Sequence, residues 1–98
     1  MTTTAVVNKR KSDYDIYIGR GSIWGNPFWP DNRPYTGDHK VTLVPDAEVL
    51  PRYEQWVRDR PSLMEKLRTL KGKRLGCYCK PKPCHGDVLV KLIEETCP

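Results

Sequence analysis

Apolar residues along the chain follow two periodicities, one typical of strands and one typical of helices. Alternating or β-branched segments predict strands at residues 5–8, 13–20 and 73–79, with a further short strand at 40–44. In the second segment, Ile16 and Ile18 face one way and Tyr17 the other, because successive side chains of a strand point to opposite faces. Gly19 and Gly21 end this strand.

Helical spacing predicts three helices in the second half of the chain. The first begins near Leu50, since Pro51 cannot lie deep inside a helix, and the second begins near Pro61 and ends before Gly72. The third covers residues 85–95. The expected inward faces are Val49, Tyr53, Trp56 and Val57, then Leu63, Leu67 and Leu70, then Val88, Leu89, Leu92 and Ile93.

This order of elements predicts the fold class. We expect residues 1–98 to form one small α/β domain, a Rossmann-like fragment with helices packed on a short, partly parallel sheet. The 98 residues allow only a modest hydrophobic core.

The net charge of the chain and its lack of signal-peptide and membrane-span patterns indicate which partners and which cellular location to expect. Seventeen Lys and Arg against twelve Asp and Glu give a net charge of +5, which favours anionic partners such as nucleotides or nucleic acids. The start, MTTTAVV, lacks the pattern of a signal peptide, and no segment has the ~20 apolar residues of a membrane span. We therefore expect a cytoplasmic protein without a membrane partner.

A loop rich in Gly, Pro and aromatic residues, IGRGSIWGNPFWP, follows the second strand. It lacks the G-x-G-x-x-G pattern of dinucleotide sites. Arg20 can still clamp a phosphate or carboxylate, and Ser22 and Asn26 can form hydrogen bonds with a ligand. Trp24 or Phe28 can stack on a base, although these aromatic residues suit a small core equally well, Phe28 above all.

The second motif, CYCKPKPCHGD, supports a zinc site as one interpretation. Cys77, Cys79, Cys84 and His85 make a complete Cys3His ligand set. Cys77 and Cys79 would leave the same face of a strand. The C-x-C spacing nevertheless differs from the usual C-x2-C of zinc sites.

An anion or thiol site is the second interpretation of the same motif. Its position between a strand and a helix start suits an anion, since backbone N–H groups are unsatisfied there. Lys80, Lys82 and Asp87 join the candidate ligand-binding residues, and Cys84 and His85 are the candidates for catalysis. The third interpretation is structural: the thiols pack as small apolar groups and Asp87 or His85 caps the helix.

Together, YIGRGSIWGNPF and LKGKRLGCYCKPKPCHGDVLVKLIEE closely resemble the domain of unknown function 4326 family of small phage and bacterial proteins. The resemblance groups Arg20, Trp24, Gly25, Asn26, Pro27 and Phe28 into one motif and Cys77, Cys79, Pro83, Cys84 and His85 into another. It implies no particular activity.

We expect the two motifs to share one pocket, because both follow predicted strands. Parallel neighbouring strands would bring both loops to one sheet edge. The leading interpretation is a pocket for a nucleotide-like or nucleic-acid anion. The alternatives are a zinc-stabilised protein-interaction module, with a host protein as partner if the chain is phage-encoded, and a cysteine-dependent transferase or hydrolase.

Overall fold

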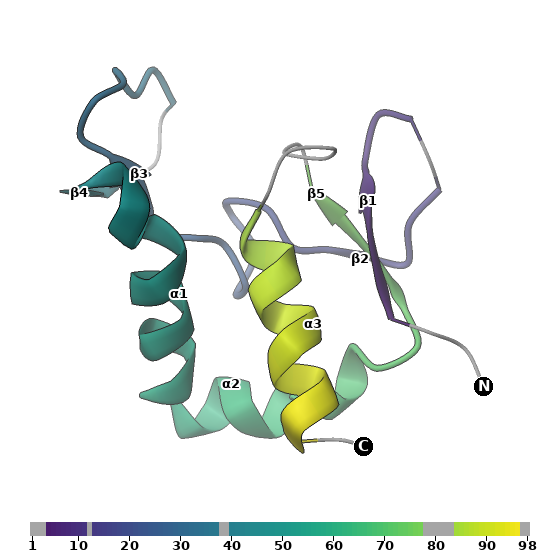
Figure 1. Ribbon diagram of the computed structural model, residues 1–98. Coiled ribbons are helices and arrows are strands. Elements are labelled where there is room, and N and C mark those ends of the chain that lie inside the picture. Colours follow the sequence, from purple (N-terminus) through teal and green to yellow (C-terminus); the bar gives the residue numbers. More distant parts are fainter. Residues whose placement is uncertain (1–3, 12, 38–39, 78–83, 97–98) are drawn as a thin grey trace.

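The computed structural model describes residues 4–11, 13–37, 40–77 and 84–96 (Figure 1). Its strands are β1 (Ala5–Asn8), β2 (Ile16–Tyr17), β3 (Phe28–Pro30), β4 (Thr42–Val44) and β5 (Arg74–Cys77). Its α-helices are α1 (Val49–Arg58), α2 (Pro61–Lys66) and α3 (His85–Thr96). Short 3-10 turns, η1 (Asp46–Glu48) and η2 (Leu67–Thr69), precede α1 and follow α2.

The main sheet is parallel and has the strand order β1-β5-β2. Leu75 of β5 is paired with Val6 on one side and Ile16 on the other, and all three contribute to the core. Gly76 is paired with Val7 and Tyr17, whose side chains point to the opposite face because strand side chains alternate. The predicted α/β class and the predicted parallel pairing are both confirmed.

The region between β2 and α1, read from the sequence as a glycine-rich loop and a strand at 40–44, contains a second sheet that the sequence pattern did not reveal. Phe28–Pro30 pairs in parallel with Thr42–Val44, so the expected strand at 40–44 is shorter and has an unforeseen partner. Two further backbone hydrogen bonds extend this ribbon, from Asp31 N–H to the Val44 carbonyl and from Thr42 N–H to the Pro27 carbonyl. The three residues of β3, Phe28–Pro30, are two aromatic residues and a proline, so they lack the alternation of apolar and polar residues that predicts a strand.

The core lies between the main sheet and the helices, which pack together on one side of it (Figure 1). Every apolar residue predicted for α2 and α3 is buried, and Tyr53 and Val57 are buried on α1. The chain turns from η2 into β5 at Gly72, whose φ of 76° favours glycine. Pro51 is the third residue of α1, where its missing N–H costs the helix no hydrogen bond.

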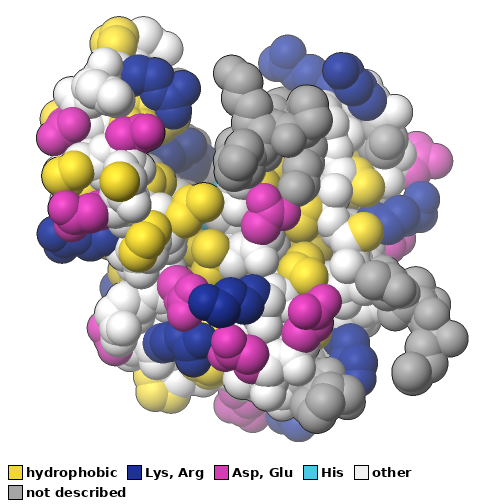
Figure 2. Space-filling view, viewed as in Figure 1, with side chains coloured by type: hydrophobic (Ala, Val, Ile, Leu, Met, Phe, Trp, Pro, Cys, Tyr) yellow, Lys and Arg dark blue, Asp and Glu magenta, His cyan; other side chains and the backbone are white. Residues whose placement is uncertain are grey.

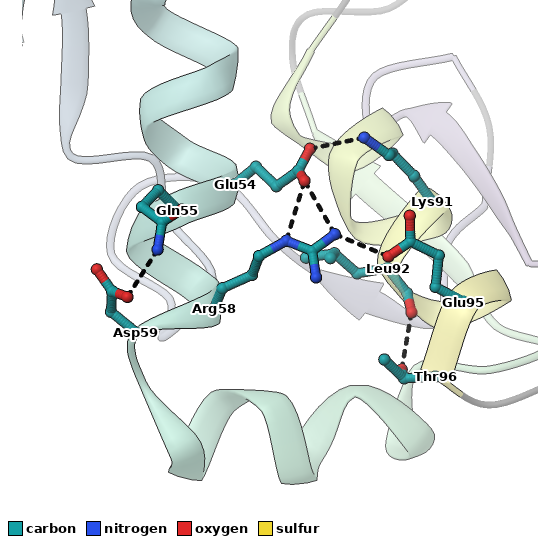
Figure 3. Close-up of polar contacts among 8 residues, drawn as sticks. All are labelled: Glu54, Gln55, Arg58, Asp59, Lys91, Leu92, Glu95 and Thr96. Carbon is teal, nitrogen blue, oxygen red and sulfur yellow. Dashed lines mark hydrogen bonds and ion pairs between the residues drawn. The ribbon is translucent and has the colours of Figure 1, made fainter.

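Ion pairs join the exposed sides of α1 and α3 (Figure 3). The Glu54 carboxylate accepts a hydrogen bond from Lys91 Nζ at 3.0 Å and pairs with Arg58 Nη2 at 2.9 Å. Arg58 also contacts Glu95 Oε2 at 2.7 Å. The hydrogen bond from Lys91, followed by that from Arg58, lowers the pKa of Glu54 below its ordinary value.

We expect Glu54→Gln to lower the free energy of unfolding at pH 7 by less than about 1 kcal/mol, because partly exposed ion pairs contribute little. A carboxylate with a lowered folded-state pKa stabilises the protein above its unfolded pKa, and this contribution disappears as pH falls through the folded pKa. Urea unfolding at pH 7 and at pH 3 measures the difference. Glu65→Gln, in an exposed pair with Arg68, is the matched control. An equal loss at both pH values would contradict this account.

Within the described residues, no helix combines the length and the apolar character needed to cross a membrane.

Candidate functional site

The two sequence motifs meet at one edge of the main sheet. β2 and β5 are parallel neighbours, so their carboxyl ends lie at the same edge of the sheet. Ile18 follows β2, and its carbonyl oxygen lies 2.6 Å from Nε2 of His85, the first residue of α3. This contact spans 67 positions of sequence and joins the glycine-rich loop to the start of the helix.

A surface pocket of about 360 Å³ lies at this junction. Its walls come from the glycine-rich loop, from β3 and the residues after it, from the region where η1 leads into α1, and from the start of α3. The lining residues are Arg20, Asn26, Phe28, Trp29, Pro30, Arg33, Asp46, Val49, Leu50, Cys84 and His85. Its volume is near the lower end of the range for small-molecule sites, about 300–1,000 Å³.

Arg20 is held in place from several sides. Its Nη2 donates a hydrogen bond to the Phe28 carbonyl at 3.0 Å. The centre of the guanidinium lies 5.1 Å from the Trp29 ring and 5.4 Å from the Tyr35 ring, both within cation–π range. Nε is buried and has no hydrogen-bond partner among the described residues. The guanidinium is therefore fixed against aromatic rings at the pocket wall, and part of its donor capacity is unused.

Asn26 is a buried polar side chain at the same wall, with 7% of its surface exposed. Its Oδ1 accepts a hydrogen bond from the backbone N–H of Phe28 at 2.9 Å. Because an N–H donor needs an acceptor, this contact distinguishes the amide oxygen of Asn26 from its nitrogen. The Nδ2 group is then the hydrogen-bond donor that Asn26 offers at the pocket.

His85 has a defined proton arrangement. A carbonyl oxygen can only accept, so Nε2 carries the proton that it donates to Ile18, and neutral Nδ1 keeps a lone pair. Burial lowers the pKa of His85 below its ordinary value, which outweighs the opposing effect of the Ile18 hydrogen bond. Tyr53 packs edge-on against the imidazole with ring centroids 5.1 Å apart. His85 is thus neutral at pH 7.

The thiols of Cys77 and Cys84 lie side by side. Their sulfur atoms are 3.2 Å apart, both residues are buried, and Cys84 lines the pocket. The backbone N–H of Gly86 donates to Cys84 Sγ at 3.2 Å, so this sulfur accepts a hydrogen bond within the first turn of α3.

Part of the predicted second motif lies outside the described residues. Cys79, Lys80 and Lys82 belong to that part, so the four-ligand zinc set and the two lysine contacts stay predictions. Among the residues that the structure does describe, no three His, Cys, Asp or Glu side chains form a group that could hold a metal ion.

Three of the predicted ligand-binding residues have other positions. Trp24 is a core residue with 3% of its surface exposed, so it is not a stacking surface. Its carbonyl oxygen accepts a 2.6 Å hydrogen bond from Tyr53 Oη, which ties the loop to α1. Ser22 Oγ donates to the Gly19 carbonyl and shapes the turn. Asp87 accepts from the Cys84 N–H and caps α3, as in the structural interpretation.

Several pocket residues were either expected mainly in another role or not predicted at all. Phe28, expected mainly as core, lines the pocket and packs partly against the core. Trp29 lies on β3 and Arg33 follows that strand, and Trp29 Nε1 donates to the Arg33 carbonyl at 2.9 Å. Asp46, Val49 and Leu50 come from η1 and α1. The pairing of β3 with β4, which the sequence pattern did not predict, is the feature that would have indicated that these residues share a pocket.

Comparison with known proteins identifies the family. The chain is 37% identical over 91 residues to a protein of Enterobacteria phage T4 described as "Uncharacterized 12.4 kDa protein in nrdA-td intergenic region"; the match covers 92% of this chain and 77% of that protein. No solved structure matches. The sequence profile of the family described as "Domain of unknown function (DUF4326)" matches residues 4–95. The chain therefore belongs to this family.

Proposed function

We propose that the pocket binds a small anionic ligand that carries a planar ring, of the nucleotide class. The observation that carries this proposal is Arg20, a guanidinium held at a pocket wall beside aromatic side chains. Guanidinium groups recognise phosphate and carboxylate through parallel hydrogen bonds. Phe28 and Trp29 supply flat apolar surface for a ring, a role that the sequence predicted for Trp24 or Phe28.

The position and polarity of the pocket support the same ligand class. It lies at the carboxyl ends of parallel strands, where α/β folds commonly bind ligands. The backbone N–H groups of Cys84 and Gly86 at the start of α3 already have protein partners, so the side chains rather than the helix start would supply the positive charge. Arg33 adds a second positive charge to the lining, and Asp46 adds one negative charge. Asn26 Nδ2 can donate a hydrogen bond and neutral His85 Nδ1 can accept one, so hydrogen bonds would also help select the ligand.

A ligand screen tests the proposal. Isothermal titration of the full chain with nucleoside monophosphates, the matching nucleosides and inorganic phosphate separates the contribution of the ring from that of the phosphate. We expect the monophosphates to bind more tightly than either part. Failure of every monophosphate to bind the folded protein at millimolar concentration would overturn the proposal.

His85 should make the stability of this site depend on pH. Its pKa is lower in the folded state than in the unfolded chain, so the unfolded chain takes up a proton first as pH falls. Stability is complete above about pH 6.5 and decreases below it, with a slope of up to about 1.4 kcal/mol per pH unit, until His85 itself protonates. Urea unfolding between pH 5 and 8 measures this slope.

His85→Gln is the matched variant for that measurement, because the glutamine amide can still donate to Ile18 but does not titrate. In this variant we expect the free energy of unfolding to change much less between pH 5 and 6.5 than in the native chain. An unchanged slope in the variant would show that other groups cause the decrease.

A further inference from the structure

The main sheet has a second face, opposite the pocket-forming helices. Within the described residues, α1, α2 and α3 all lie on the core side (Figure 1). Leu75 and Cys77 point into the core, so Gly76 between them faces outward, in register with Val7 and Tyr17. We call this surface, made by Val7, Tyr14, Tyr17 and Gly76, the outer sheet face.

Tyr14 packs against this face at Gly76, which has no side chain. A Cβ atom at Gly76 would lie 2.6 Å from Tyr14 Cγ, too close for any other residue. The ring of Tyr14 therefore packs against the backbone of the central strand at Gly76, and 38% of the residue stays exposed. It is one of three exposed large hydrophobic residues among those described, and it belongs to the segment that leads into β2.

The segments that form the outer sheet face are rich in positive charge. Lys9 Nζ lies 4.5 Å from the Tyr17 ring centroid. Residues 9–17 and 73–77 contain the five basic residues Lys9, Arg10, Lys11, Lys73 and Arg74 against the two acidic residues Asp13 and Asp15. Asp15 is paired with Arg74 at 3.4 Å. In Figure 2, Lys and Arg side chains gather at the top right of the molecule, on the side of β1.

We propose that the outer sheet face binds single-stranded nucleic acid. An exposed aromatic ring lying on a sheet, with cations around it, provides both parts of such a site: bases stack on the ring and phosphates pair with Lys and Arg. Stacking on Tyr14 needs a base that is not paired, so a duplex would have only the charges to bind. The site is distinct from the pocket and does not depend on what the pocket binds.

Fluorescence anisotropy with a labelled 12-nucleotide single strand of mixed sequence tests this proposal. We expect Tyr14→Leu, which still covers Gly76, to weaken binding about tenfold, while Tyr14→Phe keeps most of the affinity. Lys11→Gln should reduce the slope of log affinity against log salt by about 0.7, and Lys66→Gln on α2, an exposed lysine of equal charge, should leave it unchanged.

Arg20→Ala should change oligonucleotide affinity less than twofold, which separates this surface from the pocket. Two results would overturn the proposal. One is the same affinity for the single strand in Tyr14→Leu as in the native chain. The other is a concentration-dependent dimer, seen by light scattering, that Tyr14→Leu abolishes, because a second copy of the chain would then occupy this face. Circular dichroism verifies that each variant is folded.

Discussion

Arg20→Ala is expected to weaken binding of a nucleoside monophosphate by about 100-fold. Hydrogen bonds to a charged partner contribute about 1.5–3 kcal/mol, and the substitution removes the guanidinium that would hold the phosphate. Isothermal titration of the variant and the native chain with the same monophosphate measures the change. The uncharged nucleoside should lose much less affinity, because under this proposal its ring would contact Phe28 and Trp29 rather than Arg20.

Two further variants make the Arg20 experiment specific. Arg20→Lys keeps the charge but lacks the planar donor pair, so we expect a loss of about tenfold. Arg68→Ala, an exposed arginine with 71% of its side chain accessible, is the control for a change in net charge. Arg20→Ala also loses its bond to the Phe28 carbonyl, so thermal unfolding must accompany the titration. Equal losses in Arg20→Ala and Arg68→Ala would reject a direct contact.

Gly86 should be the most sensitive position for the docking of α3 on the main sheet. A Cβ atom there would lie 2.8 Å from Val6 Cγ1 and 2.9 Å from Ile18 Cδ1. Overpacking typically costs about 1–3 kcal/mol, and the better helix propensity of alanine offsets up to about 1 kcal/mol of this. We therefore expect Gly86→Ala to destabilise the protein by about 1 kcal/mol and Gly86→Val by about 3 kcal/mol, as measured by urea unfolding.

A double-mutant cycle with Val6 isolates the cause of this loss. Val6→Ala alone removes apolar contacts and should destabilise the chain. In the Val6→Ala background, Gly86→Ala should cost less by at least about 0.5 kcal/mol, because the new methyl group occupies the space that Val6 left. Strictly additive losses would mean that the contact between Gly86 and Val6 does not limit the approach of the helix.

The position of α3 also links packing to the pocket. Gly86 has no side chain, so its backbone packs close to the Ile18 side chain. The neighbouring His85 donates a hydrogen bond to the Ile18 carbonyl. Close approach of the helix to β2 is therefore what brings the imidazole within 2.6 Å of that carbonyl. We expect substitutions at Gly86 to weaken ligand binding as well as stability, although Gly86 is not among the pocket residues.

Residue patterns were sufficient for the helices and for most of the main sheet. Periodicity located α1, α2 and α3, because a helix that buries one face must place apolar residues three or four positions apart. It also located β1 and β5, and it oriented Ile16 and Ile18 toward the core. For Arg20 and Asn26, polarity within an aromatic loop predicted a ligand-binding role, since buried polar groups need partners, and both residues line the pocket.

Trp24, Phe28 and Trp29 show what the sequence by itself did not determine. All three are aromatic residues of one loop, and nothing in their chemistry tells a core position from a pocket wall. Their roles were decided by the pairing of β3 with β4 and by the hydrogen bond from Tyr53 to the Trp24 carbonyl, contacts between segments far apart in the chain. The sequence determined which residues are apolar or charged and how they repeat locally. Only the tertiary structure decided which of them share a pocket, because that depends on distances between segments that local periodicity does not encode.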